Sequence, residues 1–185
     1  MVLAAQLIKL SQRQVVAVLV GLLVAVVAEE AAVAGKFAEP RHTARAIIVH
    51  EGNLLLMERW RNDSHYFSIP GGGIEAGETA EEAVLREVLE ETNLTVEVIN
   101  LVIEMRDNDH VHKIFLCKFI DGEMMLPAHS PEAMHMSPNN RFKPCWIPTG
   151  EVESKPFSYW EPVKQSLLEG LRDGFLGEQA IVTVG

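Results

Sequence analysis

The stretch GGGIEAGETAEEAVLREVLEETNL, residues 71–94, carries most of the information in this chain. Its three glycines follow Pro70, so the backbone can turn sharply and come close to a ligand. Thr79 and Glu82 have the spacing of a capping box, which predicts that a helix begins just after Thr79. Asn93 stands where this helix should end, because Asn tolerates the left-handed conformation of a C-cap. The stretch therefore predicts a glycine-rich turn that runs into a helix.

The predicted helix combines an apolar side with a run of acids. The apolar side is formed by Val84, Leu85, Val88 and Leu89. Next to it, Glu87, Glu90 and Glu91 stand at positions i, i+3 and i+4. A charged helix face is usually only solvated, but this one lacks lysines to pair with it, and like charges at this spacing cost about 0.2–0.5 kcal/mol per pair. The acids also lie near the negative end of the helix dipole. Clustered carboxylates suit Mg²⁺ or Mn²⁺, and Mg²⁺ bridges carboxylates to phosphate oxygens.

The same residues resemble the Nudix box, G-x5-E-x7-R-E-U-x-E-E-x-G-U, where U is a bulky aliphatic residue. Eight of its nine fixed positions are filled, by Gly72, Glu78, Arg86, Glu87, Val88, Glu90, Glu91 and Leu94. Asn93 stands in place of the usual glycine, a difference that concerns the helix cap rather than the chemistry.

This resemblance implies an α/β fold, a Nudix-like α/β/α sandwich with a mixed β-sheet. It also implies hydrolysis of a nucleoside diphosphate linked to another group, in which water attacks one phosphorus of the diphosphate bridge. Glu87, Glu90 and Glu91 would bind Mg²⁺, for which Mn²⁺ is a substitute. The Gly71 carbonyl would be a further ligand, and Glu78 an outer ligand or an orienting group.

The catalytic roles are less fixed by the resemblance. Arg86 is expected to pair with a neighbouring glutamate and fix its rotamer, whereas a plain surface salt bridge would contribute little. The general base is a box glutamate in some family members, here Glu90 or Glu91, and a glutamate from a later loop in others. Glu132 is the loop candidate because loops commonly carry catalytic groups, and its alternative role is that of a solvated loop residue.

The substrate is poorly defined by the sequence. Arg59, Tyr66 and Gly72 are candidates for substrate contact. Tyr66, Phe67 or Trp60 would stack on a base or serve as ordinary core or rim residues. Residues 107–112 (DNDHVH) lack the proline and the tyrosine that mark the ADP-ribose and dinucleoside polyphosphate hydrolases of the family. We therefore predict an unmodified or oxidised nucleoside triphosphate, with ADP-ribose or a nucleotide sugar as the alternative.

Two other classes of function are alternatives. A Nudix-like regulatory domain would bind a nucleotide without cleaving it, but such domains usually lose the metal glutamates, which are all present here. An isopentenyl diphosphate isomerase would need a catalytic cysteine. The two cysteines, Cys117 and Cys145, stand in apolar strand contexts and are predicted to be buried thiols.

Composition favours a single domain with a small-molecule partner. The chain has 185 residues and a net charge of −10, which argues against a general nucleic-acid-binding surface. The seven histidines show no ligand spacing, and His110 and His112 are predicted to be surface residues on a strand. The expected state is a monomer or homodimer.

The first forty residues lie outside the family pattern. Residues 15–28 are fourteen mostly aliphatic residues without a charge, fewer than the roughly 20 that span a bilayer. Three interpretations are open: a signal or short membrane anchor, an extra packed helix, or an extension of no functional importance. The predicted organisation is an extension and linker (1–40), the Nudix domain (41–178) and a tail (179–185). The expected location is cytoplasmic, with membrane tethering or export as the alternative.

The remaining pattern predicts strands and loops around the box. Strands are expected at 43–50, 54–59, 66–69, 95–105, 110–120 and 142–148. Loops are expected at 60–65 and 126–141. A closing helix at 162–171 should cover the sheet on the side opposite the box helix.

Overall fold

The computed structural model describes residues 40–185, apart from 108, 158–160, 178 and 184–185. The chain divides at this boundary into two units, Met1–Glu39 and Pro40–Gly185. The apolar run at 15–28 and its three interpretations lie outside the described residues. Within the part that is described, no helix has the length and apolar character needed to cross a membrane.

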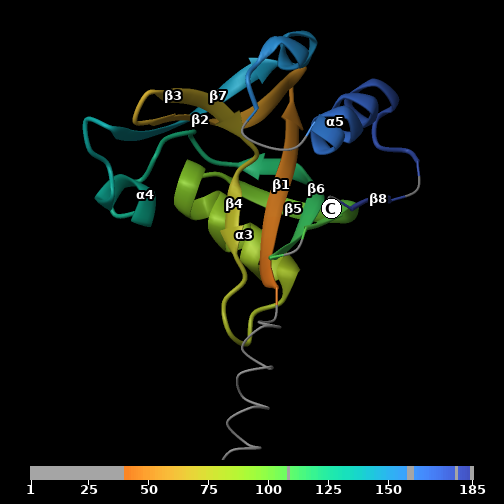
Figure 1. Ribbon diagram of the computed structural model, residues 1–185, viewed down its shortest axis with the longest axis horizontal. Coiled ribbons are helices and arrows are strands. Elements are labelled where there is room, and N and C mark those ends of the chain that lie inside the picture. The colour runs from red at the N-terminus through yellow and green to blue at the C-terminus, as the bar shows by residue number, and fades with distance from the viewer. Residues whose placement is uncertain (1–39, 108, 158–160, 178, 184–185) are drawn as a thin grey trace, which may run out of the picture. The chain divides into compact units, whose positions relative to one another are not determined.

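A mixed β-sheet forms the centre of the described unit (Figure 1). Its strands are β1 (Arg41–His50), β2 (Asn53–Arg61), β3 (Ser64–Ser68), β4 (Gly71–Gly73), β5 (Thr95–Arg106), β6 (His110–Asp121), β7 (Asn140–Pro148) and β8 (Ala180–Thr183). Their order is β3-β2-β1-β6-β5-β8, while β4 pairs with β1 and β7 with β2. The β1–β6 and β5–β8 pairs are parallel and the others antiparallel, which confirms the predicted mixed sheet.

Three α-helices and one 3₁₀ helix accompany the sheet in the described part of the chain. They are α3 (Ala80–Thr92), α4 (Pro131–Met134) and α5 (Glu161–Asp173), with a 3₁₀ helix, η1, at Thr149–Ser154. At the start of α3, the Glu82 N–H donates to Thr79 Oγ1 at 3.1 Å, and the Thr79 N–H donates to Glu82 Oε2 at 2.8 Å. Asn93 ends the helix in the left-handed conformation, with φ 60°. The predicted capping box and C-cap are confirmed.

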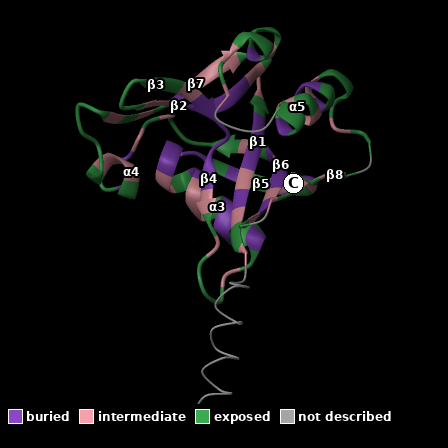
Figure 2. Ribbon diagram, viewed as in Figure 1, coloured by how far each residue is buried: buried purple, intermediate pink, exposed green. Residues whose placement is uncertain are grey.

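Alternation along β1 divides the core into two layers. Ala46 and Ile48 are fully buried in the cluster that contains the inner side of α3. Ile47, between them, is fully buried in the cluster that contains Val163 and Leu167 of α5. Because successive side chains of a strand point to opposite faces, α3 and α5 cover opposite faces of the sheet. Figure 2 shows the buried residues gathered where the sheet meets these helices. The predicted placement of the two helices is confirmed.

The buried side of α3 differs from the predicted one. Val84 and Val88 are fully buried, but Leu85 and Leu89 are 39% and 51% exposed. Ala80 and Ala83 take the inner positions instead, so the buried stripe runs along the same side as Glu87 and Glu91. The packing of this side on the sheet therefore places these two acids at the edge of the core.

Three segments expected to be irregular contain regular structure. The predicted loop 60–65 is mostly a hairpin, since β2 continues to Arg61 and β3 begins at Ser64. The predicted loop 126–141 contains the short helix α4. Within the predicted tail 179–185, Ala180–Thr183 form β8 and pair in parallel with Ile103–Arg106 of β5. Strand β3 lies at the end of the strand order and its first two residues are exposed and polar, so it lacks the apolar alternation by which strands are found.

Candidate active site

The glycine loop forms strand β4, which lies between β1 and the C-terminal half of α3. The Gly71 N–H donates to Glu91 Oε2 at 2.7 Å. Gly71 has φ 131°, and a Cβ there would collide with the Ala44 carbonyl. A Cβ on Gly72 would lie 2.5 Å from Glu87 Oε1. Gly71 therefore cannot carry a side chain, whereas a side chain on Gly72 would displace the Glu87 carboxylate.

Arg86 connects the acids of α3 to one another and to the loop. Its Nε and Nη2 donate to both carboxylate oxygens of Glu78, at 2.9 and 3.0 Å. Nη1 donates to Glu87 Oε1 at 2.9 Å, and Nη2 also donates to the Gly73 carbonyl at 2.9 Å. Glu90 Oε2 lies 3.4 Å from Nη1. Arg86 lowers the pKa of Glu78 through these hydrogen bonds, while Glu78 in turn raises the pKa of the guanidinium. A guanidinium that holds several groups in one geometry fixes the rotamer of Glu87.

Glu91 is the most deeply buried acid of the cluster. It is 8% exposed, and this burial raises the pKa of its carboxyl to about 8. The Gly71 N–H and the Arg45 guanidinium oppose this shift, while the charges of Glu132 and Glu87 add to it. Burial also raises the pKa of Glu87, although Arg86 opposes that shift. The cluster thus disfavours its own ionisation and would gain from a cation.

Glu132 reaches the cluster from α4. Ser130 caps this helix by accepting a hydrogen bond from the Ala133 N–H at 3.1 Å. Glu132 Oε2 is buried and has no hydrogen-bond partner among the described residues. The residue is half-buried overall, and its charge adds to the raised pKa values of Glu87 and Glu91. Glu132 is therefore partly shielded from solvent, and its choice as general base over a solvated loop residue stays a prediction.

These side chains fit a divalent cation of the Mg²⁺ type. Glu87, Glu90 and Glu91 offer hard carboxylate oxygens, and burial raises the pKa values of Glu87 and Glu91. Glu132 adds a buried oxygen without a hydrogen-bond partner among the described residues. The Gly71 carbonyl, expected as a further ligand, accepts a hydrogen bond from Arg45 Nη1 at 3.1 Å.

The predicted substrate-contacting residues of β2 and β3 lie on the α3 side of the sheet. Arg59 pairs with Tyr66 of β3 and with Phe142 of β7. Its guanidinium carbon lies 4.1 Å from the Phe142 ring centroid and 5.9 Å from that of Tyr66. Arg59 lies four residues after Leu55 on β2, so the two side chains point to the same face of the sheet, and Leu55 packs in the cluster that contains α3. A stacked surface of one guanidinium and two rings therefore extends the face that carries α3.

The other two aromatic candidates point to the opposite face. Phe67 is 5% exposed within the core under α5, so it is a core residue and not a base-stacking one. The Trp60 and His65 rings stack with centroids 5.1 Å apart, and the Arg141 guanidinium carbon lies 4.7 Å from the Trp60 ring centroid.

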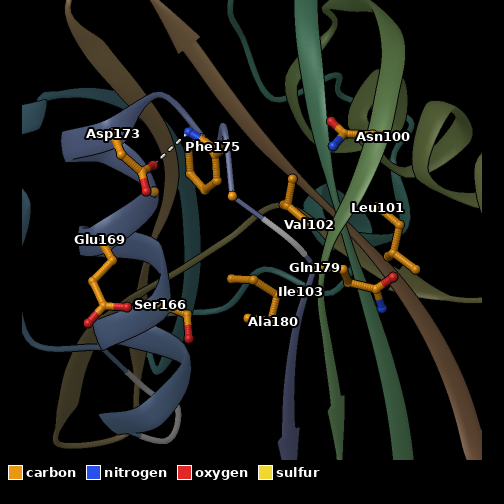
Figure 3. A pocket seen from close by; sticks show the side chains of 12 residues that line it. Asn100, Leu101, Val102, Ile103, Ser166, Glu169, Asp173, Phe175, Gln179 and Ala180 are labelled. Atoms are coloured by element: carbon orange, nitrogen blue, oxygen red, sulfur yellow. Dashed lines mark hydrogen bonds between the residues drawn. The ribbon is translucent and has the colours of Figure 1, made fainter.

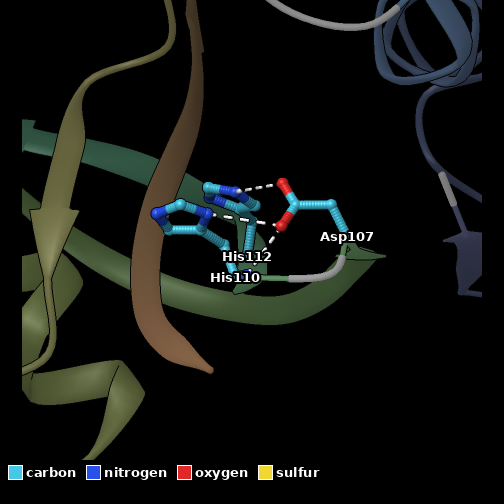
Figure 4. Close-up of side chains that lie close together, drawn as sticks. All are labelled: Asp107, His110 and His112. Carbon is cyan, nitrogen blue, oxygen red and sulfur yellow. Dashed lines mark hydrogen bonds and ion pairs between the residues drawn. The ribbon is translucent and has the colours of Figure 1, made fainter. Parts of the chain in front are cut away.

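A cleft of about 350 Å³ adjoins the glycine loop. Its lining residues are Arg41, His42, Thr43, Arg45, Gly72, Gly73, Asp107, His110 and His112. His110 and His112 were predicted to be surface residues, but His112 is buried and only 5% exposed. The absence of ligand spacing was also predicted, yet Asp107, His110 and His112 lie together (Figure 4). Burial lowers the pKa of His112 to about 4, with Arg45 and His110 adding to the shift. The signal available in the sequence was D-x2-H-x-H within DNDHVH.

A second cavity and the two cysteines lie apart from the acids. The cavity, about 100 Å³, lies between α5 and the strands β5 and β8, and none of the box glutamates is among its lining residues (Figure 3). Both cysteines are free; Cys117 is buried and Cys145 half-buried. Burial raises the pKa of the Cys117 thiol to about 12 and that of Cys145 to about 11, so neither is a ready nucleophile.

The chain resembles known proteins over most of its described length. A model of the NUDIX domain matches residues 40–168. The chain is 37% identical over 111 residues to an ADP-ribose pyrophosphatase of Methanocaldococcus jannaschii, a match that covers 56% of this chain and 66% of that protein. It is 41% identical over 61 residues to an 8-oxo-dGTP diphosphatase of Escherichia coli, covering 31% of this chain and 47% of that one. Both matches span less than two thirds of the relative's length.

The fold also matches solved structures. A NUDIX hydrolase from Nitrosomonas europaea superposes with a TM-score of 0.60 at 19% identity, covering 80% of each chain. At this identity the match supports the α/β fold alone.

Proposed function

This chain belongs to the Nudix family, and we propose on that basis that it is a Mg²⁺-dependent hydrolase of a nucleoside diphosphate linked to another group. One observation carries the proposal: Glu87 and Glu91 both lie against the glycine loop, where the Gly71 N–H donates to Glu91 Oε2 at 2.7 Å and a Cβ on Gly72 would lie 2.5 Å from Glu87 Oε1. Burial raises the pKa values of both acids, and the charge of Glu132 adds to each shift. A fold that needed only stability would not gather acids whose ionisation is opposed by burial.

Each residue of the cluster has a separate task in this proposal. Glu87, Glu90 and Glu91 hold Mg²⁺, which neutralises phosphate charge when bound and so lets a chain of net charge −10 accept a polyphosphate. Arg86 keeps Glu87 and Glu78 in position through the hydrogen bonds described above. Gly72, lacking a side chain, leaves room for the Glu87 carboxylate.

The reaction itself is a hydrolysis at phosphorus. The oxygen of water forms a bond to one phosphorus of the diphosphate bridge, and the bond from that phosphorus to the bridging oxygen breaks. The leaving group departs as a phosphate ester or as pyrophosphate. Glu132 takes the proton of the attacking water, since its buried oxygen has no hydrogen-bond partner among the described residues. Glu90 and Glu91 are the alternative bases.

The substrate class rests on two separate lines of support. The absence of the ADP-ribose-type proline from residues 107–112 favours a nucleoside triphosphate, unmodified or oxidised. The relative named ADP-ribose pyrophosphatase favours ADP-ribose or a nucleotide sugar. In either case the base would stack on the surface formed by Arg59, Tyr66 and Phe142, because rings and a guanidinium present flat faces of suitable size.

The test is a hydrolysis screen with full product identification. The wild-type protein is assayed with Mg²⁺ on nucleoside triphosphates, 8-oxo-dGTP, ADP-ribose, nucleotide sugars and dinucleoside polyphosphates. We expect turnover of one class, and loss of that turnover in Glu91→Gln. Glu81→Gln, an exposed acid in the first turn of α3, is the matched control and should keep full activity.

The same screen separates hydrolysis from simple binding. A regulatory domain would bind one of these nucleotides in a Mg²⁺-dependent manner and release no product. That result, obtained with folded protein, would overturn the hydrolase proposal in favour of the non-catalytic alternative. Turnover that persists in Glu91→Gln would place the chemistry elsewhere.

A further inference from the structure

Three potential metal ligands meet at the turn between β5 and β6 (Figure 4). Asp107 follows the last residue of β5, while His110 and His112 lie on β6 with one residue between them. His110 Nδ1 lies 3.3 Å from Asp107 Oδ1, and His112 Nε2 lies 3.9 Å from Asp107 Oδ2. One ligand atom from each residue falls within 4.8 Å of the other two. The two imidazoles thus present nitrogen atoms to the two oxygens of a single carboxylate.

The surrounding structure holds all three side chains in place. Asp107 Oδ1 accepts hydrogen bonds from the N–H groups of Asp109 and His110, at 2.8 and 2.7 Å. The two imidazole rings stack with centroids 5.4 Å apart and an interplanar angle of 20°. His112 Nδ1 bonds Thr43 Oγ1 of β1 at 2.7 Å, and its Nε2 is the ring nitrogen that faces Asp107. A hydrogen bond on the other ring nitrogen is the usual way in which proteins orient a metal-binding histidine.

We propose that Asp107, His110 and His112 form a site for a divalent transition-metal cation, separate from the carboxylate site of α3. Ligand atoms in a tetrahedral zinc site lie about 3.4 Å apart, since each bond is about 2.1 Å long. The present spacings, 3.3 and 3.9 Å, run to different oxygens of Asp107, and one ligand atom from each residue lies within 4.8 Å of the other two. The three side chains must therefore move closer by roughly an ångström to bind one cation. Imidazole nitrogen favours Zn²⁺, Co²⁺ or Ni²⁺ over Mg²⁺, so the two sites differ in the metal they select.

The site opens onto the cleft beside the glycine loop. Three protein ligands leave at least one position of the cation to another molecule. The cleft is about 350 Å³ in volume, and Arg41 and Arg45 are among its lining residues. Their positive charge opposes any cation in the cleft, including the proposed one, and favours an anionic group as its remaining ligand. The proposal does not depend on the hydrolase activity, because metal binding is measured without substrate.

The test is a Co²⁺ titration of the metal-free full-length protein in excess Mg²⁺, which occupies the carboxylate site. Visible absorption of Co²⁺ reports nitrogen ligands and low coordination. We expect one equivalent to bind, with the same spectrum in Glu87→Gln. Affinity should fall at least tenfold in His110→Gln and in Asp107→Asn, whose amide oxygen can still accept the turn hydrogen bonds. His129→Gln, at an exposed histidine outside the cluster, should match wild type.

Circular dichroism first establishes that both cluster variants are folded, and Zn²⁺ competition confirms that the two metals share one site. The proposal is overturned if Co²⁺ does not bind in excess Mg²⁺. It is equally overturned if binding survives in both cluster variants or disappears in Glu87→Gln.

Discussion

Replacing Glu91 by glutamine should remove a pH-dependent loss of stability from the metal-free protein. Burial raises the pKa of the Glu91 carboxyl to about 8, against about 4.3 in an unfolded chain. Between these values the folded state keeps a proton that the unfolded state has released. The free energy of unfolding therefore falls as pH rises, by up to ~1.4 kcal/mol per pH unit for one proton.

The useful window is pH 6.5 to 8. Below pH 6.5, the titration of His112 has the opposite effect on stability. The pKa of His112 is about 4 in the folded state and about 6.5 in the unfolded state, so its contribution makes the free energy of unfolding rise with pH. Above pH 6.5 this contribution is nearly complete. A pKa of about 8 for Glu91 then gives a loss of about 1.5 kcal/mol between pH 6.5 and 8.

Urea denaturation in EDTA at several pH values measures this difference. The amide oxygen that Glu91→Gln introduces can still accept the hydrogen bond that the Gly71 N–H gives to Glu91, so the variant tests charge rather than contact. We expect the wild type to lose about 1.5 kcal/mol more than Glu91→Gln across the window. Glu81→Gln should follow the wild type. Parallel curves for wild type and Glu91→Gln would refute the assignment of a buried, protonated Glu91.

Other predictions concern the contacts of the glycine loop and of α3, and the N-terminal segment. Gly72→Ala places a Cβ 2.5 Å from Glu87 Oε1, so kcat/KM should fall by roughly 10- to 100-fold with little change in Tm. Gly150→Ala is the control, because a Cβ there meets open space and should not change activity. Equal activities of the two variants would contradict the role of Gly72. In Arg86→Lys the single ammonium group cannot hold Glu78, Glu87 and the Gly73 carbonyl together, so kcat should fall even though the charge is kept. Full activity of this variant would show that Arg86 forms only a plain surface ion pair. Thr79→Ala removes the side-chain half of the capping box and should cost about 1 kcal/mol in urea denaturation, with kcat unchanged. Cell fractionation of the full chain and of a form starting at Lys36 tests the membrane interpretation of residues 15–28; equal amounts of both forms in the soluble fraction would exclude an anchor.

The local signals in the sequence determined the box helix correctly. The capping box at Thr79, the left-handed Asn93 and the glycine loop each depend on residues within one turn of one another. The contacts of Arg86 with Glu78 and Glu87 also lie within the same short stretch. These features were predictable because their physical causes are contained in nearby residues.

The features that were missed depend on pairing between distant segments. The exposure of Leu85 and Leu89 follows from the side of α3 that packs on the sheet, and this choice depends on strands that are distant in the sequence. The burial of His112 depends on β1, whose Thr43 lies 69 residues earlier in the chain. The approach of Glu132 to Glu91 needs both the α4 turn and the path of its loop, so the sequence supported this residue only through its position in a loop.

The central claim is that Glu87 and its neighbours hold Mg²⁺ for cleavage of a phosphoanhydride. Its most direct test is kcat/KM on the best substrate of the screen, measured against Mg²⁺ concentration for wild type, Glu87→Gln and Glu81→Gln. The account predicts that Glu87→Gln needs more Mg²⁺ and remains at least about a hundredfold slower at saturation, while Glu81→Gln matches wild type. A Glu87→Gln curve that overlays the wild-type curve would contradict the account.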